Sequence, residues 1–186
     1  MGKFILITGG ARSGKSTLAE NITDEIGDNI AYIATAIAFD DGMKDRIKKH
    51  RESRPREWTT IEKYKNFHKL KDDDNFASYD TVLLDCITLM VSNLLLEEEI
   101  DFDKASMEEI NKIEGRISEE VEELLDTLYA SNKNIVFVTN EVGMGLVPSY
   151  KLGNIFRDIA GRINQFLARK ADEVYLTVSG IPVKIK

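Results

Sequence analysis

The sequence predicts an α/β fold in which a mostly parallel sheet is flanked by helices, with an antiparallel hairpin at one edge. Short apolar runs alternate with longer amphipathic stretches, which is typical of strands and helices in a parallel sheet. The first run ends in a glycine-rich turn, and a helical pattern follows it directly. The last two apolar runs flank a Ser-Gly pair and predict the hairpin.

The N-terminal part predicts two strands and two helices. Residues 4–7 are continuously apolar, as expected of a central strand buried on both faces. Residues 18–26 carry an apolar side chain at every fourth position and predict a helix that ends at Gly27. Residues 30–34 predict the second strand. Residues 42–51 predict a basic helix, and a less regular stretch follows it.

The C-terminal part continues the alternation. Residues 81–84 and 135–138 predict two further buried strands. Helices are predicted over residues 89–96, 107–128 and 152–166. The long helix 107–128 is acidic on its polar side, and we expect that side to be solvated.

Two local signals refine this end of the chain. Ser106 and Glu109 have the spacing of a capping box at the start of the long helix. Residues 174–178 and 183–185 predict the two strands of the hairpin. Pro182 places the second of them at the edge of the sheet, because proline cannot donate to a strand ladder.

Composition limits the class of protein. A chain of 186 residues predicts a single domain over residues 1–186. The net charge of -7 argues against nucleic-acid partners and anionic membranes. No apolar stretch approaches the roughly 18 residues of a spanning helix, and the N-terminus resembles no signal peptide. The single cysteine, Cys86, excludes an internal disulfide, so we expect a cytoplasmic protein without membrane insertion.

The glycine-rich turn predicts a P-loop. Its spacing is G-x-x-x-x-G-K-S between a predicted strand and a predicted helix, so a chance glycine turn is the weaker alternative. In such a turn the backbone N–H groups and the helix N-terminus surround phosphate oxygens. The lysine contacts the β and γ phosphates and the serine hydroxyl holds Mg²⁺. The predicted phosphate-binding residues are Gly9, Gly10, Ala11, Arg12, Ser13, Gly14, Lys15 and Ser16.

A P-loop needs a second carboxylate on the magnesium side, at the tip of a neighbouring strand. Asp85 follows the apolar residues 82–84 and is the candidate, although an aspartate in this position is often only a helix N-cap. Cys86 follows it. We interpret Cys86 as a small buried side chain, because nothing nearby in the sequence would lower its pKa.

A basic segment stands out in this acidic protein. Between residues 44 and 56, seven lysine and arginine residues face only two acidic ones, which predicts a local anion site. His50 lies within the segment, and on a helix it shares the inward side of Ile47. A lone histidine of this kind is more often a packed core residue than a nucleophile. The alternative is that the neutral imidazole of His50 is a nucleophile that attacks a phosphorus atom. His68 lacks this setting and is expected at the surface.

The motifs together resemble, nearly end to end, the bifunctional adenosylcobinamide kinases/adenosylcobinamide-phosphate guanylyltransferases of cobalamin biosynthesis. Two positions depart from that pattern, because Gly42 replaces a common acid and Lys49 replaces the second histidine of some relatives. The stretches that carry the resemblance are residues 8–16, 33–35, 40–43, 46–58, 85–88, 138–145, 156–162 and 179–184.

The resemblance implies two reactions and a RecA-like P-loop fold. ATP or GTP would phosphorylate adenosylcobinamide on its aminopropanol hydroxyl. GTP would then donate GMP to a histidine, and the corrinoid phosphate would accept it, giving adenosylcobinamide-GDP and pyrophosphate. The matching histidine is His50, and Lys15 of the P-loop is the second predicted catalytic residue. Mg²⁺ is the implied cofactor, and a homotrimer is the implied assembly.

The resemblance also extends the nucleotide site beyond the P-loop. Ser16 and Asp85 are the implied magnesium ligands. The further implied nucleotide contacts are Ala34, Thr35, Ala36, Arg51, Glu52, Ser53, Arg54, Glu62 and Asp85. Two other functions fit the P-loop without this family: a plain small-molecule kinase with a structural His50, and a nucleotide-dependent regulatory switch.

Overall fold

The described strands form one seven-stranded sheet, with strand order β3-β2-β4-β5-β1-β6-β7. The computed structural model describes residues 2–37, 44, 51 and 55–186. All neighbouring strands pair in parallel except β6 and β7, which are antiparallel, so the predicted fold class is confirmed. The strands are β1 Phe4–Gly9, β2 Ile30–Ala34, β3 Thr59–Glu62, β4 Thr81–Asp85, β5 Asn134–Val138, β6 Glu173–Val178 and β7 Ile181–Lys184.

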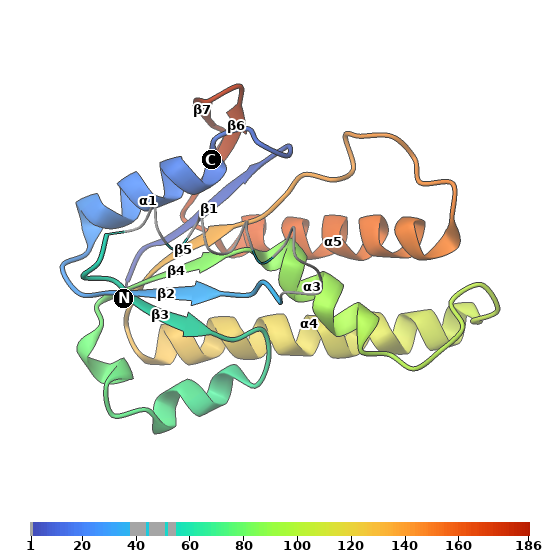
Figure 1. Ribbon diagram of the computed structural model, residues 1–186, viewed down its shortest axis with the longest axis horizontal. Coiled ribbons are helices and arrows are strands. Elements are labelled where there is room, and N and C mark those ends of the chain that lie inside the picture. Colours follow the sequence, from blue (N-terminus) through green and yellow to red (C-terminus); the bar gives the residue numbers. More distant parts are fainter. Residues whose placement is uncertain (1, 38–43, 45–50, 52–54) are drawn as a thin grey trace.

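Helices cover both faces of this sheet (Figure 1). On one face lies α1 (Lys15–Ile26), and on the other lie α3 (Ile87–Leu96), α4 (Met107–Ala130) and α5 (Lys151–Lys170). Two short 3₁₀ helices, η1 (Phe67–Asp72) and η2 (Phe76–Ser78), precede β4. Within the described ranges, no helix is long and apolar enough to cross a membrane.

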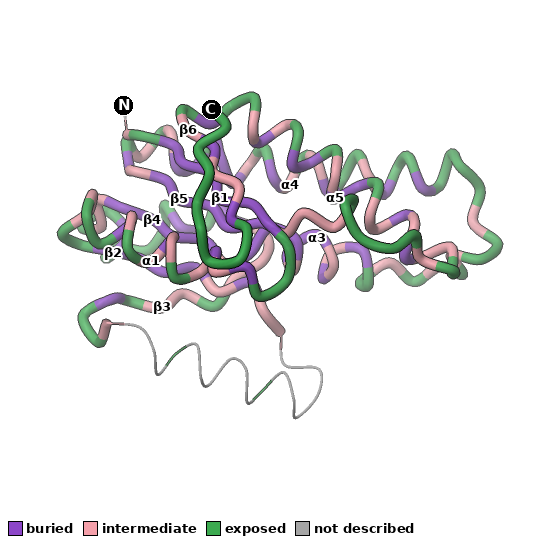
Figure 2. Tube along the Cα trace, turned by 90° about the horizontal axis from the view of Figure 1, so that it is seen from above, coloured by how far each residue is buried: buried purple, intermediate pink, exposed green. Residues whose placement is uncertain are grey.

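The central strands divide their side chains between two apolar cores. In β1, Phe4 and Leu6 pack in the core under α3, α4 and α5, whereas Ile5 and Ile7 pack in the core under α1. This alternation follows from the two-residue period of a strand. Figure 2 shows the central strands buried and the last strand, β7, exposed. The continuous apolar runs in the sequence therefore correspond to strands covered on both faces.

Most predicted elements are confirmed. Strand β2 has the predicted bounds, and α1 ends at Gly27 as expected. The capping box is present, since Ser106 and Glu109 each accept from the other's backbone N–H. The predicted basic helix lies outside the described residues except for two positions, which are helical.

The expectation that the acidic side of α4 is only solvated is wrong in part. Glu120 accepts a hydrogen bond from the backbone N–H of Asn66, and Glu123 pairs with His68 at 2.9 Å. These bonds attach the N-terminal turn of η1 to α4. Phe67 and Leu70, the apolar side chains of η1, are buried as well, so η1 is held both by these hydrogen bonds and by apolar packing.

Candidate active site

The turn between β1 and α1 has the backbone of a phosphate-binding loop. Gly9 and Gly14 have φ values of 152° and 95°, which side-chain-bearing residues rarely adopt. A Cβ atom on Gly9 would lie 2.4 Å from the carbonyl oxygen of Thr177. A Cβ atom on Gly14 would lie 3.1 Å from the Cα of Gly180. The two glycines of the motif are therefore required by close packing against the hairpin as well as by dihedral angle.

Lys15 lies inside this turn. Its side chain is only 7% exposed, and Nζ donates to the carbonyl oxygen of Gly10 at 2.6 Å. Burial lowers the pKa of the ammonium, while the nearby Cys86 and Asp85 oppose that shift. The hydrogen bond to Gly10 thus holds the amino group of Lys15 inside the loop, where the phosphates of a nucleotide would meet it.

Ser16 and Asp85 meet at the predicted magnesium side of the loop. The Ser16 hydroxyl donates to Oδ2 of Asp85 at 2.9 Å, although the two residues are 69 positions apart. The hydroxyl of Tyr32 donates to the same oxygen at 3.1 Å. Parallel pairing of β2 with β4 aligns Ala34 with Asp85 and places the carboxylate at the carboxyl end of the sheet. This is the position expected of a Walker B aspartate, and the helix N-cap role is excluded because Cys86 is the N-cap of α3.

These oxygens fit a magnesium ion. Mg²⁺ prefers oxygen ligands and is commonly held by one or two protein groups together with substrate phosphates and water. A hydroxyl and a carboxylate in contact supply such a set. In the described part of the chain no three His, Cys, Asp or Glu residues form a metal-binding group, so an all-protein metal cage is not formed there.

Three of the predicted contacts beyond the P-loop, Ala34, Glu62 and Asp85, lie along the same edge of the sheet. Register pairs Glu62 of β3 with Ala34 of β2, next to Asp85. Arg51 donates to Glu62 at 2.7 Å, with both side chains about 60% exposed. The structure therefore brings residues that are far apart in the sequence into one row, at the carboxyl ends of the adjacent strands β4, β2 and β3.

Thr35, which follows Ala34, has a structural role, because its hydrogen bonds connect the end of β2 to α3. Its hydroxyl donates to the carbonyl oxygen of Cys86 at 2.8 Å and accepts from the Cys86 N–H at 2.9 Å. Its own carbonyl accepts from Asn93 at 2.7 Å. The side chain is 1% exposed and occupied by these bonds, so a nucleotide could contact its neighbours Ala34 and Ala36, which are half-buried, more readily than Thr35 itself.

The remaining predicted site residues lie either on the loop itself or outside the described part of the chain. Gly10, Ala11 and Arg12 are exposed on the loop. Ser13 is buried, and its hydroxyl has no hydrogen-bond partner among the described residues. The predicted nucleophile His50 lies outside the described residues, as do Glu52, Ser53 and Arg54.

The interpretation of Cys86 as a small buried side chain is confirmed. The thiol is buried, and burial together with the charge of Asp85 raises its pKa to about 11. A thiol with that pKa is protonated at neutral pH and is a poor nucleophile. His68 is exposed, as expected.

A polar network that was not predicted from the sequence lies at the end of β5. Asn140 donates through Nδ2 to the hydroxyl of Thr88 at 2.7 Å, and Asn164 donates to the Asn140 carbonyl at 3.0 Å. The hydroxyl of Thr139 donates to Oδ1 of Asn164 at 2.7 Å. The network joins α3, β5 and α5 next to the P-loop. The only signal in the sequence was the polar run that follows an apolar strand, which marks a ligand-binding edge in α/β sheets.

The chain is similar to known proteins over nearly its whole length. Residues 5–185 match the family model described as cobinamide kinase / cobinamide phosphate guanyltransferase. The bifunctional adenosylcobalamin biosynthesis protein CobU of Escherichia coli is 46% identical over 185 residues, which is 98% of this chain and 99% of that protein. The protein of the same name from Salmonella typhimurium is 47% identical over 190 residues, with the same coverage. The related CobP of Pseudomonas aeruginosa is 38% identical over 181 residues, or 97% of this chain and 96% of that protein.

Matches of this extent include both the phosphate loop and the strand ends that face it. The chain therefore belongs to the cobinamide kinase / cobinamide phosphate guanyltransferase family, whose members are transferases of cobalamin biosynthesis.

Proposed function

We propose that this chain, as one domain over residues 1–186, performs both family reactions at the P-loop edge of its sheet. The observation that carries the proposal is the contact of Ser16 with Asp85 at 2.9 Å, next to the buried ammonium of Lys15. A nucleoside triphosphate in the loop would have its phosphates against the loop N–H groups and Lys15. Adenosylcobinamide and its phosphate are the proposed acceptors, and GTP and ATP the proposed nucleotides.

In the first reaction the acceptor hydroxyl attacks the γ phosphorus. Phosphoryl transfer depends mostly on positioning and on charge stabilisation, and the site supplies both through the loop N–H groups and Lys15. Ser16 and Asp85 would hold Mg²⁺, which offsets the charge of the phosphate oxygens when it is bound. The nucleoside diphosphate leaves with the electron pair of the broken P–O bond.

In the second reaction His50 is the proposed nucleophile. A neutral imidazole nitrogen attacks the α phosphorus of GTP, and pyrophosphate is released. The GMP group remains bound to the histidine as guanylyl-histidine. The corrinoid phosphate then attacks the same phosphorus and releases the imidazole. Two displacements replace one difficult step, which is the usual benefit of covalent catalysis. The basic side chains around position 50, including Arg51 beside Glu62, support phosphate binding in this part of the chain.

The test is covalent labelling with GTP that carries the radiolabel on its α phosphate. We expect acid-labile label on the wild-type protein and none on His50→Ala. The matched control is His68→Ala, which removes an exposed histidine paired with Glu123 and should label normally. Equal labelling of wild type and His50→Ala would exclude His50. A wild type that phosphorylates cobinamide but never takes up label would favour the plain kinase.

We also propose that the protein assembles as a homotrimer and that it is cytoplasmic. The loop after β5 exposes apolar side chains that a subunit contact would cover, since Leu146 is 95% exposed and Met144 79% exposed. Light scattering of the purified protein should give three times the mass of the 21.0 kDa chain. We expect Leu146→Asp to lower that mass, and an unchanged trimer would exclude this loop as the contact.

A further inference from the structure

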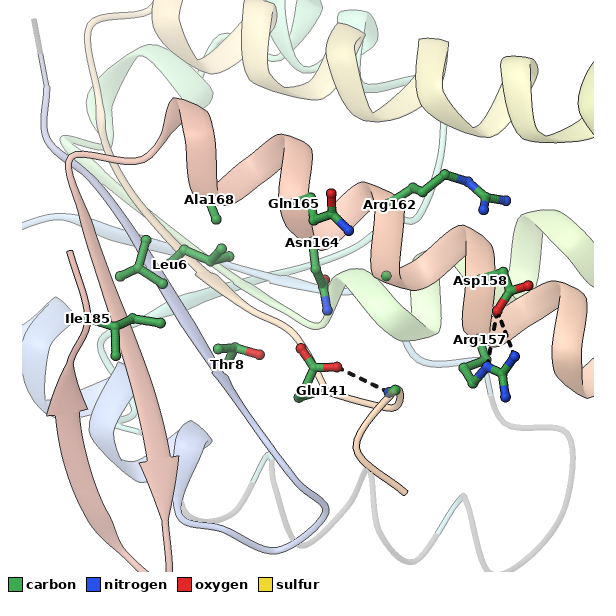
Figure 3. Close-up of a pocket in the computed structure, with 13 residues that line it drawn as sticks. Leu6, Thr8, Glu141, Arg157, Asp158, Arg162, Asn164, Gln165, Ala168 and Ile185 are labelled. Atoms are coloured by element: carbon green, nitrogen blue, oxygen red, sulfur yellow. Dashed lines mark hydrogen bonds and ion pairs between the residues drawn. The ribbon is translucent and has the colours of Figure 1, made fainter. Parts of the chain in front are cut away.

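A cavity of about 470 Å³ opens between α5 and the β1–β6 part of the sheet (Figure 3). Leu6 and Val174 contribute apolar surface from the strands, and Gly161 and Asn164 line it from α5. The cavity is on the α5 face of the sheet. It therefore lies on the opposite side of the sheet from α1.

This cavity nevertheless adjoins the phosphate loop. Thr8 and Glu141 both line it, and Thr8 directly precedes the first glycine of the loop. The backbone N–H of Glu141 donates to the carbonyl oxygen of Gly9 at 3.0 Å. One carboxylate oxygen of Glu141 accepts from the N–H of Gly143 at 3.1 Å, which orients the side chain. A ligand in the cavity would thus have one end next to the P-loop.

Thr8 indicates that the cavity is built for a polar ligand. Its side chain is 9% exposed, and its hydroxyl has no hydrogen-bond partner among the described residues. In Figure 3 that hydroxyl points towards Glu141 across the cavity. A buried hydroxyl without a partner is destabilising, and most such groups in native proteins are satisfied. A ligand hydroxyl or amide in the cavity would satisfy it.

The charges around the cavity argue against an anionic ligand. Arg157 is paired with Asp158 at 2.9 Å, and Arg162 is paired with Glu114 at 2.7 Å between Nη2 and Oε2. The middle of α5 lines the cavity, not its N-terminus, so no helix dipole is directed at the space. Paired arginines, an extra carboxylate and apolar walls suit a neutral group that carries hydroxyl and amide functions on hydrocarbon.

We infer that this cavity receives the hydroxyl-bearing arm of cobinamide and that Glu141 takes the proton of its hydroxyl. The inference rests on the proposed function, because the phosphoryl acceptor must reach the P-loop. The hydroxyl oxygen forms a bond to the γ phosphorus, and the bond from that phosphorus to the β–γ bridging oxygen breaks. Its electron pair leaves on the nucleoside diphosphate, and the hydroxyl proton passes to the Glu141 carboxylate.

Filling the cavity is the first test. A Cβ atom on Gly161 would meet nothing within 4 Å, so Gly161→Leu places a side chain in the space without a backbone clash. We expect its KM for cobinamide in the kinase reaction to rise about tenfold or more, with an unchanged KM for GTP. The matched control is Gly115→Leu, at an exposed position of α4 that also has open space around its Cβ. Equal cobinamide KM values for the two variants would overturn the inference.

Two further variants keep the test decisive if Gly161→Leu fails to fold. Thr8→Val preserves shape and removes only the unpartnered hydroxyl, so we expect an unchanged or higher melting temperature and a cobinamide KM raised about tenfold. An unchanged KM would contradict the proposed binding mode. Glu141→Gln should lower kcat for phosphorylation about 100-fold or more.

Protein labelling by α-labelled GTP separates this inference from the proposed function. That labelling uses an imidazole nucleophile and no cobinamide, so Glu141→Gln and Gly161→Leu should label like wild type. Loss of label in Glu141→Gln equal to its loss of kinase activity would exclude a role as proton acceptor. Absence of label in wild type would contradict the His50 step alone, because the kinase KM would still report on the cavity.

Discussion

The backbone N–H of Gly180 donates a 2.9 Å hydrogen bond to the carbonyl oxygen of Ser13. The donor is at the tip of the β6–β7 hairpin and the acceptor is in the phosphate loop, 167 positions earlier in the chain. Gly180 has a φ of 82°, which glycine adopts without strain. The C-terminal hairpin thus supports the loop, and it also limits the space beside Gly14. The hairpin is therefore part of the proposed nucleotide site, although no nucleotide contact was predicted for it.

Gly180→Pro tests this support. Proline removes the N–H and cannot adopt a positive φ, so the bond to Ser13 is lost and the tip must move. We expect the Kd for GTP to rise about tenfold, as the loss of one hydrogen bond with added strain implies. Calorimetric titration with GTP measures it. Ser179→Ala is the control, and a Kd equal in all three proteins would show that the hairpin does not support the loop.

Asp85→Asn tests the magnesium side of the site. The amide keeps the shape of the side chain and removes the charge that faces Ser16, so we expect both activities to fall about 100-fold or more. Tyr32→Phe is the matched control, since it removes a hydroxyl that bonds the same Asp85 oxygen but leaves the charge in place. Activity of each variant is measured across a range of magnesium concentrations. Equal activities of Asp85→Asn and Tyr32→Phe would contradict the proposed metal role.

The strands and helices with long apolar patterns were predictable because burial determines them locally. Residues 30–34 form β2 within the predicted bounds, and the P-loop was identified from its spacing between a strand and a helix. Strand β3 was missed. It has four residues, none of them fully buried, and it lies at the edge of the sheet, so its pairing with β2 leaves no apolar run in the sequence.

Contacts between distant segments could not be predicted in the same way. The Ser16–Asp85 contact was expected because both residues belong to a known constellation at strand ends. Nothing in the local sequence links Gly180 to Ser13 or Asn164 to Asn140, since those bonds depend on how the hairpin and α5 pack against the sheet. The cavity beside Glu141 likewise exists only once α5 is placed on β1.

Cys86 should resist alkylation in the folded protein. Its pKa is raised to about 11, so below pH 10 only a small fraction is thiolate, and the side chain is 5% exposed. We expect no carboxamidomethyl group after incubation with iodoacetamide at pH 8, as measured by intact mass. The same treatment in 6 M guanidinium should add one group, because the chain has a single cysteine. Rapid labelling of the folded protein would show that the thiol is accessible and reactive.

Glu173 should make folding stability dependent on acidic pH. Hydrogen bonds from Lys184, Lys3 and Tyr175 lower the pKa of its carboxylate to about 2, from an ordinary value of 4.5. The folded pKa is below the unfolded one, so the stabilisation is complete above pH 4.5 and is lost as the pH falls towards 2. The two lysines are 45% and 49% exposed, and solvent screening reduces the contribution to about 1 kcal/mol.

The measurement is the free energy of urea unfolding for wild type and Glu173→Gln at several pH values. At pH 7 the variant should be less stable by about 1 kcal/mol. That difference should shrink between pH 4.5 and the lowest pH at which both proteins still fold, because protonation removes the same charge from the wild type. Glu99→Gln is the control, at an exposed position away from the hairpin. A difference that stays constant with pH would mean that Glu173 acts through packing, since the substitution would then cost the same whether or not the carboxylate is charged.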